Sequence, residues 1–289
     1  MKSRAVVLSF SLLILFAFKA DKPAYKLFTG EGKQVKYEKM IQDVAAADVV
    51  FFGELHDNPI AHWLELEVTR SIHTIRGADL VLGAEMFESD NQLLIDEYTS
   101  SMYDASKFEA EVKLWKNYKT DYKPLVDLAR ENKLKFVATN IPRRYASMVS
   151  KGGFEVLDSI SAEAKALIAP LPILYDPELK CYKDMMEMGG MGGHVTENFP
   201  KAQAVKDATM AHFILENLSS GKVLIHYNGS YHSKNHEGII WYLNQARPGI
   251  SIKTIEQVSQ DTIDRVEVGN LEVADYIIVV PASMTKTYR

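Results

Sequence analysis

The sequence predicts an α/β protein: a mainly parallel β-sheet with helices on both faces and helical insertions over the carboxyl ends of the strands. Three observations indicate this class. Apolar runs of strand length recur along the chain. Stretches with helical spacing of apolar residues separate them, as the crossovers between parallel strands require. Polar side chains follow directly where several of these runs end, which is where open α/β sheets bind ligands.

Residues 1–20 have the pattern of a secretory signal peptide. Lys2 and Arg4 form a basic start, an apolar run over 5–18 follows, and small residues suited to cleavage end it. The run is short for a membrane span, which needs ~20 residues. No cysteine follows it, so we expect export to the periplasm or cell envelope, not as a lipoprotein. Residues 21–289 are then expected to form a single domain.

Apolar runs that end in glycine or a polar residue indicate the strands. The first is Val49–Gly53, which is β-branched or aromatic until glycine ends it. Such continuous apolar runs are typical of strands that are buried on both faces of a parallel sheet. The expected strands are 49–53, 80–87, 134–139, 222–228, 250–255 and 274–280.

Helical spacing of apolar residues fills most of the intervals. A helix is expected over 59–75, where Asp57 or Asn58 caps the N-terminus and proline occupies the first turn. Two longer stretches, at about 89–128 and 145–221, are expected to be helical insertions above the strand ends.

The composition excludes several classes of function. A formal net charge of −5 offers no basic surface, so nucleic acid is not an expected partner. Cys181 is the one cysteine of the sequence, which rules out an intramolecular disulfide and a cysteine-rich metal site. An exported chain without disulfides depends on its hydrophobic core, and 289 residues are enough to bury one.

Two segments of the form G-x-x-H follow apolar strands, at Gly53–His56 and Gly229–His232. Glu85 lies near the end of another apolar run. Because the carboxyl ends of parallel strands share one edge of a sheet, these side chains are expected to converge. Imidazole and carboxylate with an open position are a common donor set for metals, so His56, His232 and Glu85 are the candidate ligands of a divalent metal ion.

The same side chains suit a hydrolase. Either a metal activates water, or His56 acts as a general base that Glu54 or Glu85 orients. The candidate catalytic residues are therefore Glu54, His56, Glu85 and His232. No G-x-S-x-G segment is present, so an acyl-serine route is not expected.

Two arginines, Arg143 and Arg144, follow the strand expected over 134–139. Guanidinium groups at a strand exit suit the carboxylate or phosphate of a small anionic ligand. Solvated surface arginines explain the pattern equally well. A protein that binds a small anion at these arginines and catalyses no reaction is a third alternative.

Short segments in a fixed order carry a resemblance to a known family. They are 53–58 with His62, Glu85-Met86, 122–125, 138–143, 207–211 and 228–232. In these segments the sequence resembles the ChaN-like haem-binding proteins, which are related to the Tiki and TraB proteins and more distantly to the erythromycin esterases.

The resemblance implies an exported bacterial protein of haem and iron acquisition, in which a tyrosine can ligate haem iron and dimers can enclose the cofactor. It also implies haem transport components of the cell envelope as partners. The candidate cofactor-binding residues are Tyr122, His62, Arg143 and Arg144, with the arginines placed for the haem propionates. In the Tiki branch the doubled G-x-x-H serves a divalent-metal peptidase. We therefore expect a haem-binding protein, with a metal-dependent hydrolase as the alternative; the sequence leaves open whether it is an enzyme.

Overall fold

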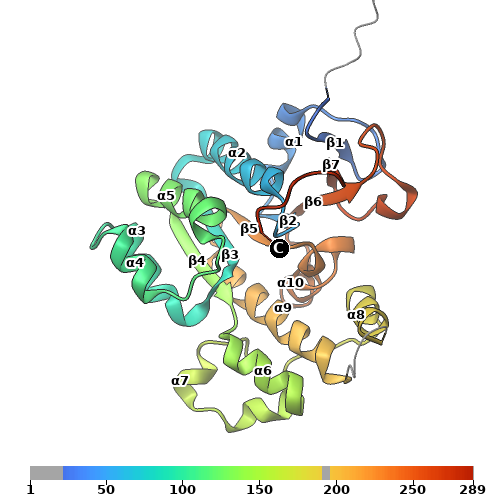
Figure 1. Cartoon of the computed structure of the whole chain (residues 1–289). Helices are drawn as coiled ribbons and strands as arrows, with labels where there is room; N and C mark the ends of the chain where they lie inside the picture. The colour runs from blue at the N-terminus through green and yellow to red at the C-terminus, as the bar shows by residue number, and fades with distance from the viewer. Residues whose placement is uncertain (1–21, 191–195, 289) are drawn as a thin grey trace, which may run out of the picture.

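A seven-stranded sheet in the order β1-β7-β6-β2-β5-β3-β4 forms the centre of the computed structural model (Figure 1). The structure describes residues 22–190 and 196–288, so the expected signal peptide lies outside the described residues. Neighbouring strands are parallel, except that β1 and β7 are antiparallel. The strands are β1 (Lys26–Thr29), β2 (Val49–Glu54), β3 (Leu80–Glu88), β4 (Lys135–Asn140), β5 (Val223–Gly229), β6 (Ile252–Gln260) and β7 (Tyr276–Pro281). The predicted mainly parallel α/β class is confirmed.

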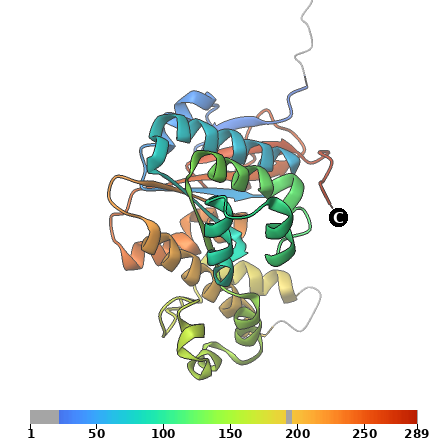
Figure 2. The same ribbon diagram turned by 90° about the vertical axis from the view of Figure 1, so that its left-hand side faces the viewer.

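Helices cover both faces of the sheet, as Figure 2 shows from the side. One face packs against α1 (Tyr37–Val44), α2 (Pro59–Arg76), α3 (Gln92–Thr99), α4 (Ala105–Glu111) and α5 (Lys123–Asn132). The other packs against α6 (Arg143–Gly152), α9 (Asn198–Asn217) and α10 (Ile239–Ala246). The short helix α7 (Ala162–Lys165) and α8 (Lys180–Gly190) lie in the second long insertion.

The apolar run of β2 is continuous because both of its faces are buried. Val50 and Phe52 belong to the core under α2 and α5, whereas Val49 and Phe51 belong to the core under α9 and α10. Side chains alternate between the faces of a strand, so a strand covered on both sides needs an apolar residue at every position. The predicted cap of α2 is also confirmed: the Asn58 side chain accepts the Ile60 backbone N–H at 3.0 Å.

Two features of the sheet differ from the expectation. The strand β1 was missed, because it is a four-residue edge strand in a polar, turn-rich segment. No α-helix connects β6 and β7 in the described chain; the connection contains a single short 3-10 helix, Val268–Asn270. Its Val266 and Val273 pack on Ile277 and Val279 of β7 and cover that end of the sheet in place of a helix. Among the described residues, no helix is both long and apolar enough to cross a membrane.

Candidate functional site

The pairing of β2, β5 and β3 places the predicted site residues at one edge of the sheet. β2 and β5 are parallel neighbours in a register that sets Glu54 opposite Gly229, and β3 pairs with β5 on its other side. A short 3-10 helix, Ser230–His232, follows β5 directly. Glu54, His56, Glu85 and His232 therefore converge, as the sequence predicts, although their roles stay predictions.

The buried carboxylate of Glu54 holds His56. Glu54 is 1% exposed, and its Oε1 lies 2.6 Å from His56 Nδ1. A carboxylate oxygen accepts, so Nδ1 carries the proton and Nε2 is the free nitrogen of the neutral ring. Burial opposes a charge on His56, but the hydrogen bond to Glu54 and the charge of Glu85 outweigh burial and raise the pKa of His56. Glu54 thus holds the His56 ring in the way that a carboxylate holds the histidine of a general base in an enzyme.

Tyr122 also donates to Glu54. Its hydroxyl lies 2.6 Å from Glu54 Oε1, and the residue is 2% exposed. Burial, followed by the charges of Glu54 and Glu65, holds the pKa of Tyr122 far above its usual value, so the hydroxyl keeps its proton. The haem-binding role expected for Tyr122 stays a prediction, and in this structure the hydroxyl points inward to Glu54.

Gly229 allows His56 and Glu85 to approach each other. A Cβ at Gly229 would lie 2.7 Å from His56 Nε2 and 3.7 Å from Glu85 Oε2. The Gly229 N–H donates to Glu85 Oε2 at 2.8 Å. The glycine of the second G-x-x-H segment is therefore needed for space at the site, and its backbone also orients the carboxylate.

Replacing Gly229 with alanine is expected to displace the His56 ring, because no real Cβ approaches another atom so closely. The ring can rotate outward, since the His56 side chain is 37% exposed, so we expect a loss of about 1–3 kcal/mol in stability. NMR of the histidine side-chain nitrogens would detect the displacement. Gly269→Ala is the matched control, because a Cβ there meets nothing within 4 Å. Unchanged His56 resonances in Gly229→Ala would contradict the assignment.

His232 is held between two buried carboxylates. Its Nδ1 hydrogen-bonds to Asp207, and its Nε2 lies 3.3 Å from Glu85 Oε1. Burial disfavours the charged ring, but Glu85 and Asp207 outweigh this and raise the pKa of His232 to about 10. Asp207 also accepts from the Tyr182 hydroxyl at 2.9 Å. Asp207 was not predicted as a site residue, although it begins the segment 207–211 that carries part of the family resemblance.

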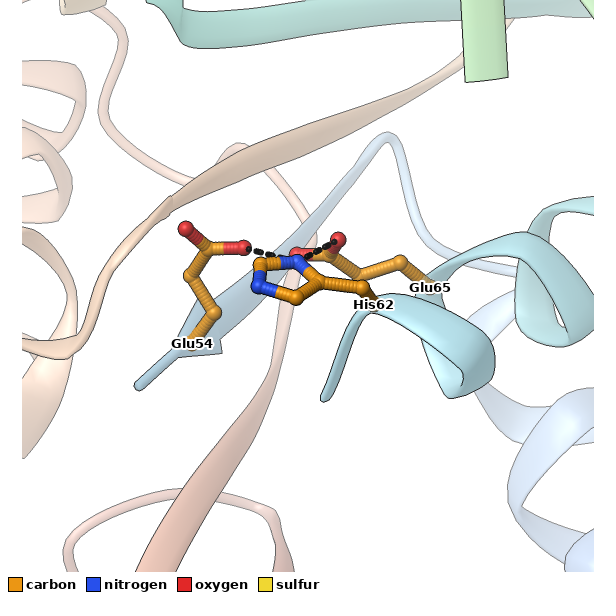
Figure 3. Close-up of side chains that lie close together, drawn as sticks. All are labelled: Glu54, His62 and Glu65. Carbon is orange, nitrogen blue, oxygen red and sulfur yellow. Dashed lines mark hydrogen bonds and ion pairs between the residues drawn. The ribbon is translucent and has the colours of Figure 1, made fainter. Parts of the chain in front are cut away.

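A second buried cluster joins Glu54, at the end of β2, to His62 and Glu65 on α2 (Figure 3). His62 Nδ1 lies 3.2 Å from Glu54 Oε2 and 3.3 Å from Glu65 Oε2. Burial disfavours a charge on His62, but the interactions of the ring with the carboxylates of Glu54 and Glu65 outweigh burial and raise the pKa of His62 to about 11. Sequence reasoning missed Glu65, which lies one helical turn after His62 on the face of α2 that enters the core.

Two sets of side chains are candidates for holding a metal ion. In residues 22–190 and 196–288, Glu54, His62 and Glu65 form the group whose donor atoms all lie within 4.8 Å of one another. The expected set of His56, His232 and Glu85 stays a prediction. Both imidazoles of this set already bind a carboxylate: His56 binds Glu54, and His232 binds Asp207.

A cleft of about 440 Å³ opens above Glu85 and Asn140. Trp115 forms part of its wall and meets the His56 ring edge-on, with ring centroids 5.0 Å apart. Its cations are Lys113, Lys116, Arg143 and Lys206. Lys113 pairs with Glu88 at 2.8 Å. The cleft thus combines aromatic surface with positive charge.

The two predicted arginines differ in position. Arg143 begins α6 and lines the cleft. Arg144 instead pairs with Asp90 at 2.5 Å and stacks over the Tyr145 ring, and it is not among the residues that line the cleft. The helix points neighbouring side chains in different directions, so one arginine reaches the cleft and the other does not.

The C-terminal segment crosses the same edge of the sheet and contacts the loop that follows β2. The Thr287 N–H donates to the Asp57 carbonyl at 2.8 Å, and Lys286 pairs with the Asp57 carboxylate. Tyr288 lines the cleft, with the Lys116 ammonium 4.5 Å from its ring centroid. The chain end therefore supplies a phenol to the cleft.

Fold and site together define an α/β protein with an imidazole–carboxylate network beneath a cationic cleft at the strand ends. The sequence model described as "Haem-binding uptake, Tiki superfamily, ChaN" matches residues 40–243. The chain belongs to this haem-binding ChaN family, as the resemblance of its sequence implied.

Two solved structures show a similar fold. ChaN of Campylobacter jejuni, whose structure is described as showing cofacial haem binding, aligns with a TM-score of 0.69 and 17% identity over 89% of this chain and 96% of that chain. A mutant of the erythromycin esterase EreC in its open conformation aligns with a TM-score of 0.51 and 11% identity over 91% and 98%. At these identities the likeness shows the fold alone. No curated protein matches the sequence.

Proposed function

We propose that the chain is an exported haem-binding protein of haem and iron acquisition, and that the cleft at the strand ends holds the porphyrin. The observation that carries this proposal is the set of cations around Trp115 in a haem-family fold. Haem needs apolar or aromatic surface for its ring and positive groups for its two propionates. The cleft offers Trp115 and Ile141 for the ring, and Arg143 and Lys206 for the propionates.

A second cavity suits the ring but not the propionates. It has a volume of about 360 Å³, is lined mostly by apolar residues such as Leu215, and includes His212 and Tyr242. No lysine or arginine lines it in the described part of the chain. A porphyrin there would leave two carboxylates without partners, so the cleft at the strand ends is the better site.

Tyr288 is the proposed axial ligand, because it is the tyrosine that lines the cleft. A phenolate bound to ferric haem gives a distinctive visible spectrum, so Tyr288→Phe is expected to change that spectrum. Tyr175→Phe, which lies outside the cleft, serves as the control.

A homodimer that encloses the cofactor is also proposed, because the family resemblance of the sequence implies one. The haem-to-chain ratio and the mass of the complex would test this, and envelope transport components are the proposed partners.

Haemin titration followed by tryptophan fluorescence tests the proposed site. Trp115 lines the cleft, so bound haemin should quench its emission strongly by energy transfer. Trp115→Ala should weaken haemin binding, as followed by quenching of the remaining tryptophans, because the ring loses part of its aromatic wall, whereas Trp241→Ala, on α10, should not. An unchanged haemin affinity in Trp115→Ala would contradict the proposed site.

A hydrolase is the second candidate function, and one observation favours it. His56 and His232 are each oriented by a buried carboxylate, and both approach Glu85 at the floor of the cleft. An imidazole held in this way can act as a general base toward water. If this activity exists, His56→Ala should abolish hydrolysis of peptide or ester substrates while leaving haem affinity within threefold of the wild type.

A further inference from the structure

We propose that Glu54, His62 and Glu65, which Figure 3 shows facing one another, bind a divalent transition-metal ion inside the protein. This site is independent of haem binding. It also differs from the donor set that the two G-x-x-H segments suggest, because it includes neither His232 nor Glu85.

The hydrogen bonds of His62 identify which nitrogen is free. Its Nε2 lies 3.0 Å from the backbone carbonyl of His56 and 3.3 Å from Asp121 Oδ2. Both partners accept, so Nε2 carries a proton, and in the neutral ring that a metal ion requires, Nδ1 has the lone pair. That lone pair points at Glu54 and Glu65, whose oxygens are also acceptors. Buried acceptor atoms that face one another in this way require a cation or an additional proton between them.

The distances favour a metal ion over a shared proton. Charge-assisted N–H···O bonds are about 2.7–2.9 Å long. Ligand atoms about 2.0–2.2 Å from a tetrahedral zinc ion lie roughly 3.3–3.6 Å from one another. His62 Nδ1 lies 3.2 Å from Glu54 Oε2 and 3.3 Å from Glu65 Oε2, which is close to the separation of two ligands on one metal.

Unsatisfied oxygens provide independent support. Glu54 Oε2 and Glu65 Oε1 accept no hydrogen bond, although both residues are at most 1% exposed. Throughout the described chain, the ion-pair partners of these carboxylates are the histidines His56 and His62. Two buried carboxylates without a fixed cation are costly, and a bound divalent ion would neutralise both.

The surroundings fix the ligands in the way that metal sites require. Asp121 accepts from Asn117 at 2.8 Å and lies on the Nε2 side of His62, so it orients the ring without being a ligand. Glu54 would bridge the two centres: Oε2 would bind the metal, while Oε1 holds His56 and Tyr122. One imidazole and two carboxylates suit Zn²⁺ or Mn²⁺ better than Mg²⁺.

Metal analysis after refolding tests the site. The chain would be unfolded in guanidinium with EDTA and refolded without haem in Zn²⁺, Mn²⁺ or Mg²⁺; after desalting, the bound metal would be measured by mass spectrometry. We expect about one Zn²⁺ or Mn²⁺ per chain, no retained Mg²⁺, and a melting temperature that EDTA lowers. A folded chain that retains no transition metal overturns the proposal, whatever its haem affinity.

A matched pair of variants locates the ion. Glu65→Gln keeps the shape of a ligand but removes its charge, and should lower metal affinity about 10–100-fold or more. Glu256→Gln is the control, because Glu256 is also 1% exposed and has an unsatisfied oxygen, but bonds to Ser233. It should keep the metal. Full metal content in Glu65→Gln would overturn the proposal; if this variant does not fold, the wild-type refolding result decides alone.

Discussion

Replacing Glu54 with alanine is expected to cost about 3–5 kcal/mol of stability, measured in chelator so that no metal contributes. The carboxylate is 1% exposed and is contacted by His56, Tyr122 and His62. Its removal leaves a buried phenol and a buried imidazole without their acceptor, and it also opens a cavity. The loss would appear as a lower free energy of unfolding in urea.

Two comparisons separate this network from a general effect of losing a carboxylate. Tyr122→Phe removes one hydrogen bond to a charged group and should cost about 1.5–3 kcal/mol. Glu88→Ala removes a carboxylate of β3 that pairs with exposed Lys113, and should cost ~1 kcal/mol or less. If Glu54→Ala were as mild as Glu88→Ala, Glu54 would not organise the site.

Reversing two charges of the cleft is expected to weaken haemin binding about 100-fold. In the double variant Arg143→Glu, Lys206→Glu, carboxylates replace the cations proposed to meet the propionates. Like charges placed together cost several kcal/mol, and each 1.4 kcal/mol is a tenfold change in Kd. Titration of haemin followed by visible absorption gives the affinity, and the wild-type affinity should fall as salt is raised.

Arg144→Glu is the matched control for this experiment. It lies on the same helix as Arg143, but pairs with Asp90 outside the cleft. Haemin affinity should stay within about threefold of the wild type. Equal losses in Arg144→Glu and in the double variant would show that net charge, and not the cleft, governs binding.

Much of the site could be predicted from the sequence, because strand order and glycine position decide it. The G-x-x-H segments follow β2 and β5, and parallel neighbours must end at the same edge of the sheet. The His56 ring leaves no room for a Cβ at Gly229, which explains why the second segment also has glycine at the end of its strand. These features are local to each strand end, so residue type and spacing reveal them.

The partners that helices bring to the site could not be predicted in this way. Glu65 and Asp207 come from α2 and α9, and their approach depends on how each helix packs on the sheet. A carboxylate on a helix normally faces water, and only the tertiary structure shows that these two are buried. The same limit applies to Arg143 and Arg144, which are adjacent in sequence but differ in their access to the cleft.

A crystal structure of the haemin complex tests the central claim most directly. The account predicts the porphyrin in the cleft at the strand ends, with its ring against Trp115 and its propionates at Arg143 and Lys206. Porphyrin density in the apolar cavity beside His212, with the strand-end cleft free of haem, would contradict it.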